Sequence, residues 1–307
     1  MKLSTKSCCG LDLQKEYLSV VLYFADKRAA TPVILKPLSS PASADAEVWN
    51  LWEAELKNIK GQLKHYASSI ICGVPADFAV IKICSTDADE DAPREVLEWE
   101  LSQQIIGSID EYSFDFQKIG GDDGAPVSRY LVAAYRKEYV DRLAGMIRKL
   151  KLQPRIVDFD VFGLVNAFEA NYPEKMDIPA MLVHCENRMT KMVLTKNGGF
   201  LDYHCLEHTT PYIDPDPYAA VVAAEIEKFL SVSPQAQGGV PGGIYLTGSF
   251  LKADENRTAA IAAIPGAEIL NPFKEIKCQL EGIDEKQLLE HSTQLAVAIG
   301  LSLRTEE

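Results

Sequence analysis

Asp12 is the residue whose surroundings most clearly suggest chemistry. It stands near the end of the apolar run Cys8–Leu13, and a second apolar run begins at Leu18, so the stretch Gln14–Tyr17 predicts a tight turn between two strands. A carboxylate beside such a turn can hold magnesium and, through the ion, a phosphate group. Loops that bind phosphate usually contain glycine, because their backbone amides must come close to the anion. The turn after Asp12 has no glycine, so phosphate binding is an open question.

Two interpretations of Asp12 follow from this turn. In the first, its short carboxylate stabilises the turn by accepting hydrogen bonds from nearby backbone amides, as aspartates in turns often do. In the second, it belongs to a nucleotide site together with Lys15, whose ammonium group could meet a phosphate. The missing glycines favour the first interpretation.

Four further residues are of types that ligate metals: His184, Glu186, His204 and His208. The spacing of His204 and His208 brings both side chains to one face only on a helix, whereas residues 198–206 read as a strand. The pattern therefore favours ordinary core or surface histidines over a metal site. No set of Ser, His and Asp with a recognisable nucleophile elbow is present, and the carboxylates are not paired in a pattern that indicates a catalytic cleft.

Composition limits the classes of protein to which the chain can belong. Its 307 residues are enough for two domains, and 47% hydrophobic with 24% charged residues is ordinary for a globular protein. The net charge of -13 argues against nucleic-acid binding and against direct contact with an anionic membrane. No run approaches the 18 apolar residues that a membrane-spanning helix needs, and Met1–Gly10 lacks the apolar core of a signal peptide. Any membrane association is therefore expected to go through a partner.

The seven cysteines predict free thiols rather than disulfides or a metal site. They are odd in number and scattered, and most lie in apolar strand-like runs without a Cys-x-x-Cys pair. Buried free thiols are typical of a reducing compartment.

The first part of the chain reads as three strands, a helix and a fourth strand. The strand-like runs are Cys8–Leu13, Leu18–Phe24, Pro32–Leu38 and residues 69–74. Between the last two, apolar residues at helical spacing predict one buried helix face, best explained as core packing: Trp49, Trp52, Leu56, Ile59, Leu63 and Tyr66.

The same order of elements returns in the last part of the chain. Strands are expected at residues 180–185, 190–196 and 200–206, with Asn197-Gly198 as a hairpin turn between the second and third. A helix with Val222, Ile226 and Phe229 facing inward follows, then a strand, a helix, a short strand and a last helix. The repeated order, rather than residue identity, predicts a duplicated α/β fold.

Residues 77–152 predict a small inserted α/β subdomain with its own core. The segment reads as a strand (Ala79–Ser85), an acidic loop, a helix, two strands (Ser113–Ile119 and Arg129–Arg136) and a second helix. The second helix has Val140, Leu143, Ile147 and Leu150 on one face. The acidic run Asp87–Asp91 is expected to be a solvated loop, although it could face a basic partner.

The order of elements resembles the actin/Hsp70 ATPase superfamily and, within it, the PilM family. The resemblance rests on the Asp12 turn, on residues 130–168 (strand ending in Ala-Ala, helix, then "IVDFDVFGLVNAF"), on "NPFKEI" at Asn271–Ile276 and on "AIGLSLR" at Ala298–Arg304. It implies a duplicated actin-like (RNase H-like) ATPase fold. The first half would comprise residues 1–76 and 153–178, the insertion residues 77–152, and the second half residues 179–307.

Three loops depart from the superfamily pattern. The first, Gly-x-Asp-x-Gly, keeps Gly10 and Asp12 but has Gln14 in place of the second glycine. The second, usually Asp-x-Gly, reads His184-Cys185-Glu186, with Thr190 retained slightly later. The third keeps one glycine, in Thr247-Gly248-Ser249-Phe250.

These departures oppose phosphate binding. The new side chains block the approach of backbone amides, Glu16 and Glu186 add negative charge, and Phe250 is expected to crowd the adenine side. We therefore expect a degenerate site. If ATP and magnesium still bind, the resemblance assigns their binding to Asp12, Lys15, Thr190 and Gly248.

The resemblance implies a binding protein rather than an enzyme. PilM proteins are cytoplasmic platform components of type IV pilus machines, held at the inner membrane by binding the N-terminal peptide of PilN. The groove for this peptide is bordered by the inserted subdomain, here near Ala79–Ile119, and other platform or motor proteins are further candidate partners. One alternative is a working ATP-dependent switch or slow ATPase. Another is the cytoplasmic part of a GspL-like type II secretion protein, which would continue into a transmembrane helix beyond Glu307.

Overall fold

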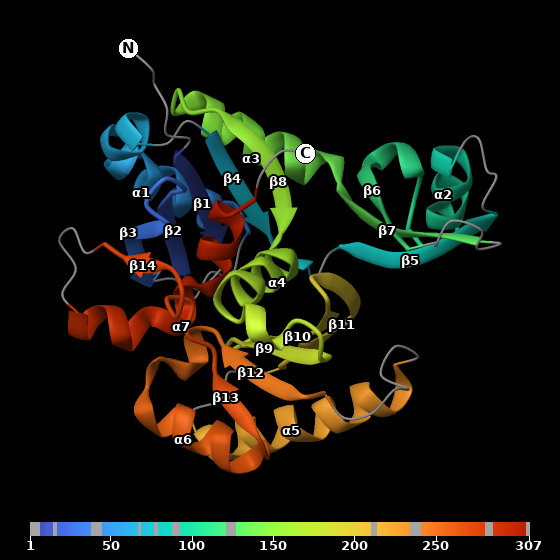
Figure 1. Cartoon of the computed structure of the whole chain (residues 1–307). Coiled ribbons are helices and arrows are strands. Elements are labelled where there is room, and N and C mark those ends of the chain that lie inside the picture. The colour runs from blue at the N-terminus through green and yellow to red at the C-terminus, as the bar shows by residue number, and fades with distance from the viewer. Residues whose placement is uncertain are drawn as a thin grey trace. The chain divides into compact units, whose positions relative to one another are not determined.

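The chain forms two compact units, each with its own sheets (Figure 1). One unit comprises residues 1–74 and 150–307, and the other comprises residues 75–149. The computed structural model describes residues 7–14, 17–37, 45–66, 69–76, 79–87, 93–120, 127–209, 214–233, 241–279 and 285–304. Lys15, Glu16 and most of the predicted acidic loop, residues 88–92, lie outside these ranges.

The first half of the larger unit is built on a six-stranded sheet with the order β14-β3-β2-β1-β4-β8. Its strands are β1 (Ser7–Leu13), β2 (Tyr17–Phe24), β3 (Ala29–Pro37), β4 (Ser69–Val74), β8 (Pro154–Phe159) and β14 (Lys277–Cys278). β1, β2 and β3 pair in antiparallel fashion, and β4 and β8 continue the sheet in parallel with β1. β3 begins at Ala29 rather than at Pro32, because Ala29 and Ala30 pair with the end of β2. The two-residue strand β14 was not predicted.

The second half repeats this arrangement. Its strands are β9 (Ala180–Cys185), β10 (Met189–Lys196), β11 (Gly199–Glu207), β12 (Gly243–Thr247) and β13 (Ala267–Ile269), in the order β11-β10-β9-β12-β13. The first three are antiparallel, and β12 and β13 are parallel to β9. Asn197 and Gly198 both have positive φ angles, 52° and 71°, as the predicted hairpin turn requires. The duplication predicted from the order of elements is confirmed.

Helices α4 (Asp160–Asn171) and α7 (Glu285–Ser302) lie between the two sheets (Figure 1). They approach so closely that a Cβ added at Gly300 would lie 1.7 Å from the carbonyl oxygen of Gly163. Only glycine leaves room for this contact between the two backbones. The glycine of the "GLSLR" stretch, Gly300, is thus required by the close crossing of the two helices.

The remaining helices of the larger unit are α1 (Asp45–Tyr66), α5 (Pro215–Val232) and α6 (Asp254–Ala263). The apolar face predicted for α1 is confirmed as core: Trp49, Trp52, Leu56, Ile59 and Leu63 are all buried, and the side chain of Tyr66 lies outside the described residues. Val222, Ile226 and Phe229 of α5 are buried against the second sheet, also as predicted. Short 3-10 helices occur at η3 (Pro173–Lys175) and η5 (Ser249–Lys252).

The smaller unit is a three-stranded antiparallel sheet with two helices. Its strands are β5 (Val80–Asp87), β6 (Tyr112–Gly120) and β7 (Val127–Arg136), in the order β5-β7-β6. Its α-helices are α2 (Pro93–Ser102) and α3 (Lys137–Lys149), and a short 3-10 helix occurs at η2 (Ile109–Glu111). Its core comprises Cys84, Leu97, Leu101, Tyr130, Val132 and Ala134. The insertion thus has the predicted α/β elements and a core of its own.

All seven cysteines are free thiols, as predicted, and Cys9, Cys72, Cys84 and Cys185 are buried. Burial raises the pKa of Cys72 and of Cys185 to about 12. These two groups are therefore neutral and unreactive at physiological pH. Among the described helices, none has the length and apolar character that crossing a membrane requires.

Candidate functional site

The first two predicted loops meet in the larger unit, where the β1–β2 hairpin approaches the β9–β10 hairpin. The first hairpin contributes Asp12, Gln14 and Tyr17, and the second contributes His184, Glu186 and Lys191. Asp160, the first residue of α4, completes this polar cluster. All seven side chains belong to buried residues. Buried polar groups at this density must bond to one another, because water is not available to them.

Asp12 accepts two hydrogen bonds from side chains. The amide of Gln14 donates to Oδ1 over 2.7 Å, and the hydroxyl of Tyr17 donates to Oδ2 over 3.0 Å. The amides of Lys15 and Glu16, in the turn itself, lie outside the described residues, so the predicted bonds from turn amides to Asp12 stay a prediction. The side chains of Gln14 and Tyr17, on either side of these two residues, both turn toward Asp12. The indole of Trp52 donates to the carbonyl of Gln14 over 3.1 Å and so ties the hairpin to α1.

Asp160 forms an ion pair with Lys191, and both side chains are almost completely buried. The amide of Gln14 also lies 3.4 Å from Oδ2 of Asp160, so Gln14 stands between two carboxylates. Lys191 comes from β10 of the second half, and Asp160 opens a helix of the first half. The ion pair therefore links the two halves of the larger unit.

Glu186 bonds to the third loop. Its Oε1 lies 3.0 Å from Nε2 of His184 and accepts the backbone N–H of Ser249 over 3.3 Å. Nε2 of His184 lies 3.3 Å from the hydroxyl of Tyr17, which is a second connection between the halves. Glu186, which replaces the glycine of the second loop, thus accepts the N–H of Ser249, which would otherwise be available to an anion.

Gly248 holds the third loop against β9. Its φ angle is 110°, and a Cβ at this position would lie 2.2 Å from the carbonyl oxygen of Cys185. Its N–H donates to the carbonyl of Thr293 over 3.0 Å. The single retained glycine is therefore required by the backbone itself, whether or not a ligand binds.

Thr190 is bound to the core of the second half. Its hydroxyl lies 2.9 Å from Nε2 of His208 and 2.8 Å from the hydroxyl of Tyr218. The ring of Tyr218 stacks on Phe250 with 3.7 Å between centroids. Of the four residues predicted to bind a nucleotide, Asp12, Thr190 and Gly248 are all engaged by protein groups, and Lys15 lies outside the described residues.

The histidines considered as metal ligands lie in different surroundings. His184 joins the polar cluster, His208 bonds to Thr190, and His204 bonds to Glu225 over 2.8 Å. In the part of the chain that the structure describes, no group of three or more His, Cys, Asp or Glu side chains is arranged to hold a metal ion.

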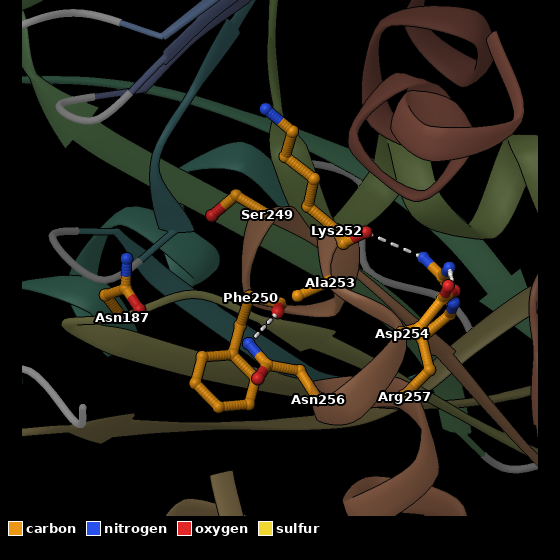
Figure 2. A pocket seen from close by; sticks show the side chains of 8 residues that line it. All are labelled: Asn187, Ser249, Phe250, Lys252, Ala253, Asp254, Asn256 and Arg257. Atoms are coloured by element: carbon orange, nitrogen blue, oxygen red, sulfur yellow. Dashed lines mark hydrogen bonds and ion pairs between the residues drawn. The ribbon is translucent and has the colours of Figure 1, made fainter. Parts of the chain in front are cut away.

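An open pocket of ≈ 430 Å³ lies beside the third loop (Figure 2). Its lining residues are Asn187, Ser249, Phe250, Lys252, Ala253, Asp254, Asn256 and Arg257. Two of its polar side chains hold the backbone of η5: Asn256 donates to the carbonyl of Phe250, and Arg257 donates to those of Leu251 and Lys252. Figure 2 shows the side chain of Lys252 extending away from Arg257.

Burial changes the protonation of the cluster. It raises the pKa of Asp12 from its ordinary value of 3.8 to about 7, opposed by nearby His184 and by the hydrogen bond from Gln14. The carboxylates of Asp160 and Glu186 add to the rise. A carboxyl group that is partly protonated at neutral pH is a weak ligand for magnesium.

The raised pKa of Asp12 predicts a pH dependence of stability. The folded protein keeps a proton that the unfolded chain loses above its ordinary pKa of 3.8. The stabilisation that this retained proton provides is fully present below pH 3.8 and is lost as the pH rises through about 7. Relative to Asp12→Asn, the wild-type free energy of unfolding is expected to fall between pH 4 and pH 7, by at most about 1.4 kcal/mol per pH unit.

Denaturant unfolding of both proteins at several pH values measures this difference. Glu169, whose pKa is also raised to about 7 by burial, contributes equally to both and cancels. Glu255→Gln, at an exposed position, controls for the loss of a carboxyl group as such. If the free energy of unfolding of the wild type, relative to that of Asp12→Asn, stays constant or rises with pH, the raised pKa of Asp12 is contradicted.

Two members of the cluster, Asp160 and Lys191, lie outside the three predicted loops, and Tyr17 was predicted only as the last residue of the Gln14–Tyr17 turn. Lys191 lies in a strand that is buried on both faces, from Thr190 to Thr195. A lysine inside such a strand needs a carboxylate partner. This requirement is the signal in the sequence that could have indicated a buried ion pair at Lys191.

Comparison with solved structures shows the fold. A chain of the "PilM-PilN type IV pilus biogenesis complex" is similar with a TM-score of 0.78 and 18% identity, covering 97% of this chain and 98% of that chain. The cytoplasmic domain of EpsL, an inner membrane component of the type II secretion system of Vibrio cholerae, is similar with a TM-score of 0.52 and 11% identity, covering 99% of this chain and 97% of that chain. The predicted actin-like ATPase fold is confirmed.

Comparison with sequences assigns the family. Curated protein sequences give no match. The sequence model of the family described as "Type IV pilus assembly protein PilM" matches residues 31–200, which is more than half of the 307 residues. The chain therefore belongs to the PilM family of type IV pilus assembly proteins.

Proposed function

We propose that this protein is a cytoplasmic adaptor of a type IV pilus assembly platform. It binds the N-terminal peptide of a PilN-like inner-membrane protein, which holds it at the membrane, and other platform or motor proteins are further partners. The observation that carries this proposal is the similarity to a chain of the PilM-PilN complex over 97% of the length, together with membership of the family. The fold similarity to EpsL has a TM-score of 0.52 against 0.78, so the pilus is favoured over the secretion machine.

The second part of the proposal is that the nucleotide site is closed by the protein's own side chains. Three contacts made by residues in or beside these loops support it. Gln14 occupies the space between Asp12 and Asp160, Glu186 accepts the amide of Ser249, and Lys191 is neutralised by Asp160. Each contact uses a group that could otherwise bind a phosphate or its magnesium ion.

ATP and magnesium do not fit this arrangement. The cluster already contains three carboxyl groups, from Asp12, Asp160 and Glu186, and a polyphosphate placed beside them would add like charge in a buried site. The lysine ammonium is held in a buried ion pair, so freeing it for a phosphate would leave Asp160 without compensation. The fold is therefore kept as a binding scaffold, without an ATPase cycle.

Calorimetric titration tests both parts of the proposal. Titration with the N-terminal peptide of the PilN-like protein from the same organism is expected to give saturable heat, and a scrambled peptide none. No heat with the cognate peptide contradicts the adaptor role.

Titration with ATP and magnesium is expected to give no saturable heat up to about 1 mM, which corresponds to roughly -4 kcal/mol of binding free energy. Saturation near one site per chain at micromolar affinity means that the site is open. If Asp12→Ala then abolishes the heat, the nucleotide-switch alternative is correct. If Asp12→Ala leaves the affinity unchanged, ATP binds elsewhere.

A further inference from the structure

Two large apolar side chains of the smaller unit are exposed, one on α2 and one just after it. Trp99 is 61% exposed and Ile106 is 82% exposed, whereas Leu97 and Leu101 on the opposite side of the helix are completely buried. The N–H groups of Gln104 and Ile105 both donate to the carbonyl of Leu101, so the helical turn continues beyond Ser102. Ile106 follows this turn just beyond the end of α2, seven residues after Trp99 in the chain.

The backbone at Ile106 is held in place from two directions. The hydroxyl of Tyr112 donates to its carbonyl over 3.4 Å, and the guanidinium of Arg136 donates to it over 3.1 Å. Arg136 also lies 4.6 Å from the centroid of the Tyr112 ring and pairs with Glu111. An exposed isoleucine on an anchored backbone loses little conformational entropy when a partner covers it.

The charge around Trp99 is negative. Glu95 lies one turn before Trp99 on the same side, Glu98 is adjacent to it, and the last turn of α2 contains no basic residue. The nearest positive charge of the helix, Arg94, is directed over the ring of Phe114 at 4.4 Å. Lys82 pairs with Glu100 and therefore does not neutralise Glu95 or Glu98.

We propose that the exposed surface formed by Glu95, Glu98 and Trp99 of α2, with Ile106 just beyond the helix, binds a Lys/Arg-rich protein segment that carries an apolar residue. Tryptophan is a frequent anchor of protein interfaces, and its ring also attracts a lysine or arginine cation. The two glutamates select a basic partner by complementary charge. A second copy of this chain would bring the same glutamates together, and an anionic membrane would be repelled by them. The basic segment is proposed as a partner of the adaptor in addition to the PilN-type peptide.

Tryptophan fluorescence reports on this surface directly. Trp49 and Trp52 are buried, with 7% and 3% exposure, so Trp99 is the tryptophan whose emission responds to a ligand at the surface. The probe is a synthetic amphipathic helix of lysine and leucine, with a glutamate–leucine peptide of the same pattern as its charge-reversed control. The lysine peptide is expected to bind saturably with a blue shift, and more weakly at 0.5 M salt. The glutamate peptide is expected not to bind.

Variants of the full chain locate the site. By calorimetry, Trp99→Ala is expected to weaken binding of the lysine peptide about tenfold or more, and Ile106→Ser and Glu95→Lys/Glu98→Lys several-fold. Val232→Ser, at 67% exposure, and Glu255→Lys, on α6, are the matched controls and are expected to change affinity by less than about twofold. Thermal unfolding shows whether each variant is folded, and exposed Trp99 is not needed for folding.

Five results would overturn the proposal. The lysine peptide gives no saturable binding. The control variants weaken its binding as much as Trp99→Ala does, which means that the peptide is attracted non-specifically to an acidic protein. The glutamate peptide binds equally well, which removes the charge argument. Phosphatidylcholine vesicles shift the emission of Trp99, which makes a membrane the occupant. Sedimentation shows self-association that Trp99→Ala abolishes, which makes a second copy the occupant.

Discussion

Replacing Lys191 with methionine is expected to lower the free energy of unfolding by about 3–5 kcal/mol, the usual effect of removing one partner of a buried ion pair. The side chains of Lys191 and Asp160 are 2% and 0% exposed, so the carboxylate that remains cannot be solvated. Methionine has a similar length, so loss of packing contributes little. Denaturant unfolding at pH 7, followed by the fluorescence of Trp49 and Trp52 in the same unit, measures the change.

Two further variants separate the buried charge from other effects. Lys191→Met combined with Asp160→Asn is expected to recover more than half of the loss, because the unpaired charge is gone and an acceptor remains for the N–H of Val161. Lys274→Met breaks the exposed pair with Glu174 and is expected to change stability by less than about 1 kcal/mol. Equal effects of Lys191→Met and Lys274→Met contradict the proposed closure of the cluster by a buried ion pair.

Gly300→Ala is expected to destabilise the larger unit by at least about 2 kcal/mol, although alanine is the better helix former. The added Cβ would lie 1.7 Å from the carbonyl oxygen and 2.6 Å from the carbonyl carbon of Gly163, and 2.9 Å from the backbone nitrogen of Ala167. These are backbone atoms, so no side chain can move aside and α4 must separate from α7. Loss of stability by chemical denaturation is the measurement.

Gly61→Ala is the matched control for this prediction. Gly61 lies inside α1, and a Cβ there meets nothing within 4 Å. The same substitution is therefore expected to stabilise the protein by about 0.5–1 kcal/mol through helix propensity alone. Effects of the same sign at Gly61 and Gly300 contradict the close crossing of α4 and α7.

The elements of the fold could be predicted because each leaves a local pattern. The apolar runs of β1 and β2, the three-and-four spacing of α1 and the Asn197-Gly198 turn are all properties of neighbouring residues. Their repeated order was enough to predict the duplication. β14 was not predicted, because a strand of two residues has no pattern of its own and depends on pairing with β3.

The candidate site was predicted only in part. The sequence identified Asp12, Gln14 and Glu186, because they stand in loops where glycine was expected. It did not identify Asp160 and Lys191 as partners, because they are 31 positions apart and belong to a helix and a strand of different halves. Nor did it show that the side chains of Gln14 and Tyr17 bind Asp12.

The sequence by itself determined the class of fold, the repeat and the insertion, because hydrophobic periodicity is set by residues close together in the chain. It also determined that three loops lost glycines and gained side chains. Only the tertiary structure decided where those side chains go: Gln14 between two aspartates, Glu186 onto the amide of Ser249, and Lys191 onto Asp160. The physical reason is that the partner of a buried charge is chosen by proximity in space, which the spacing of residues along the chain does not specify.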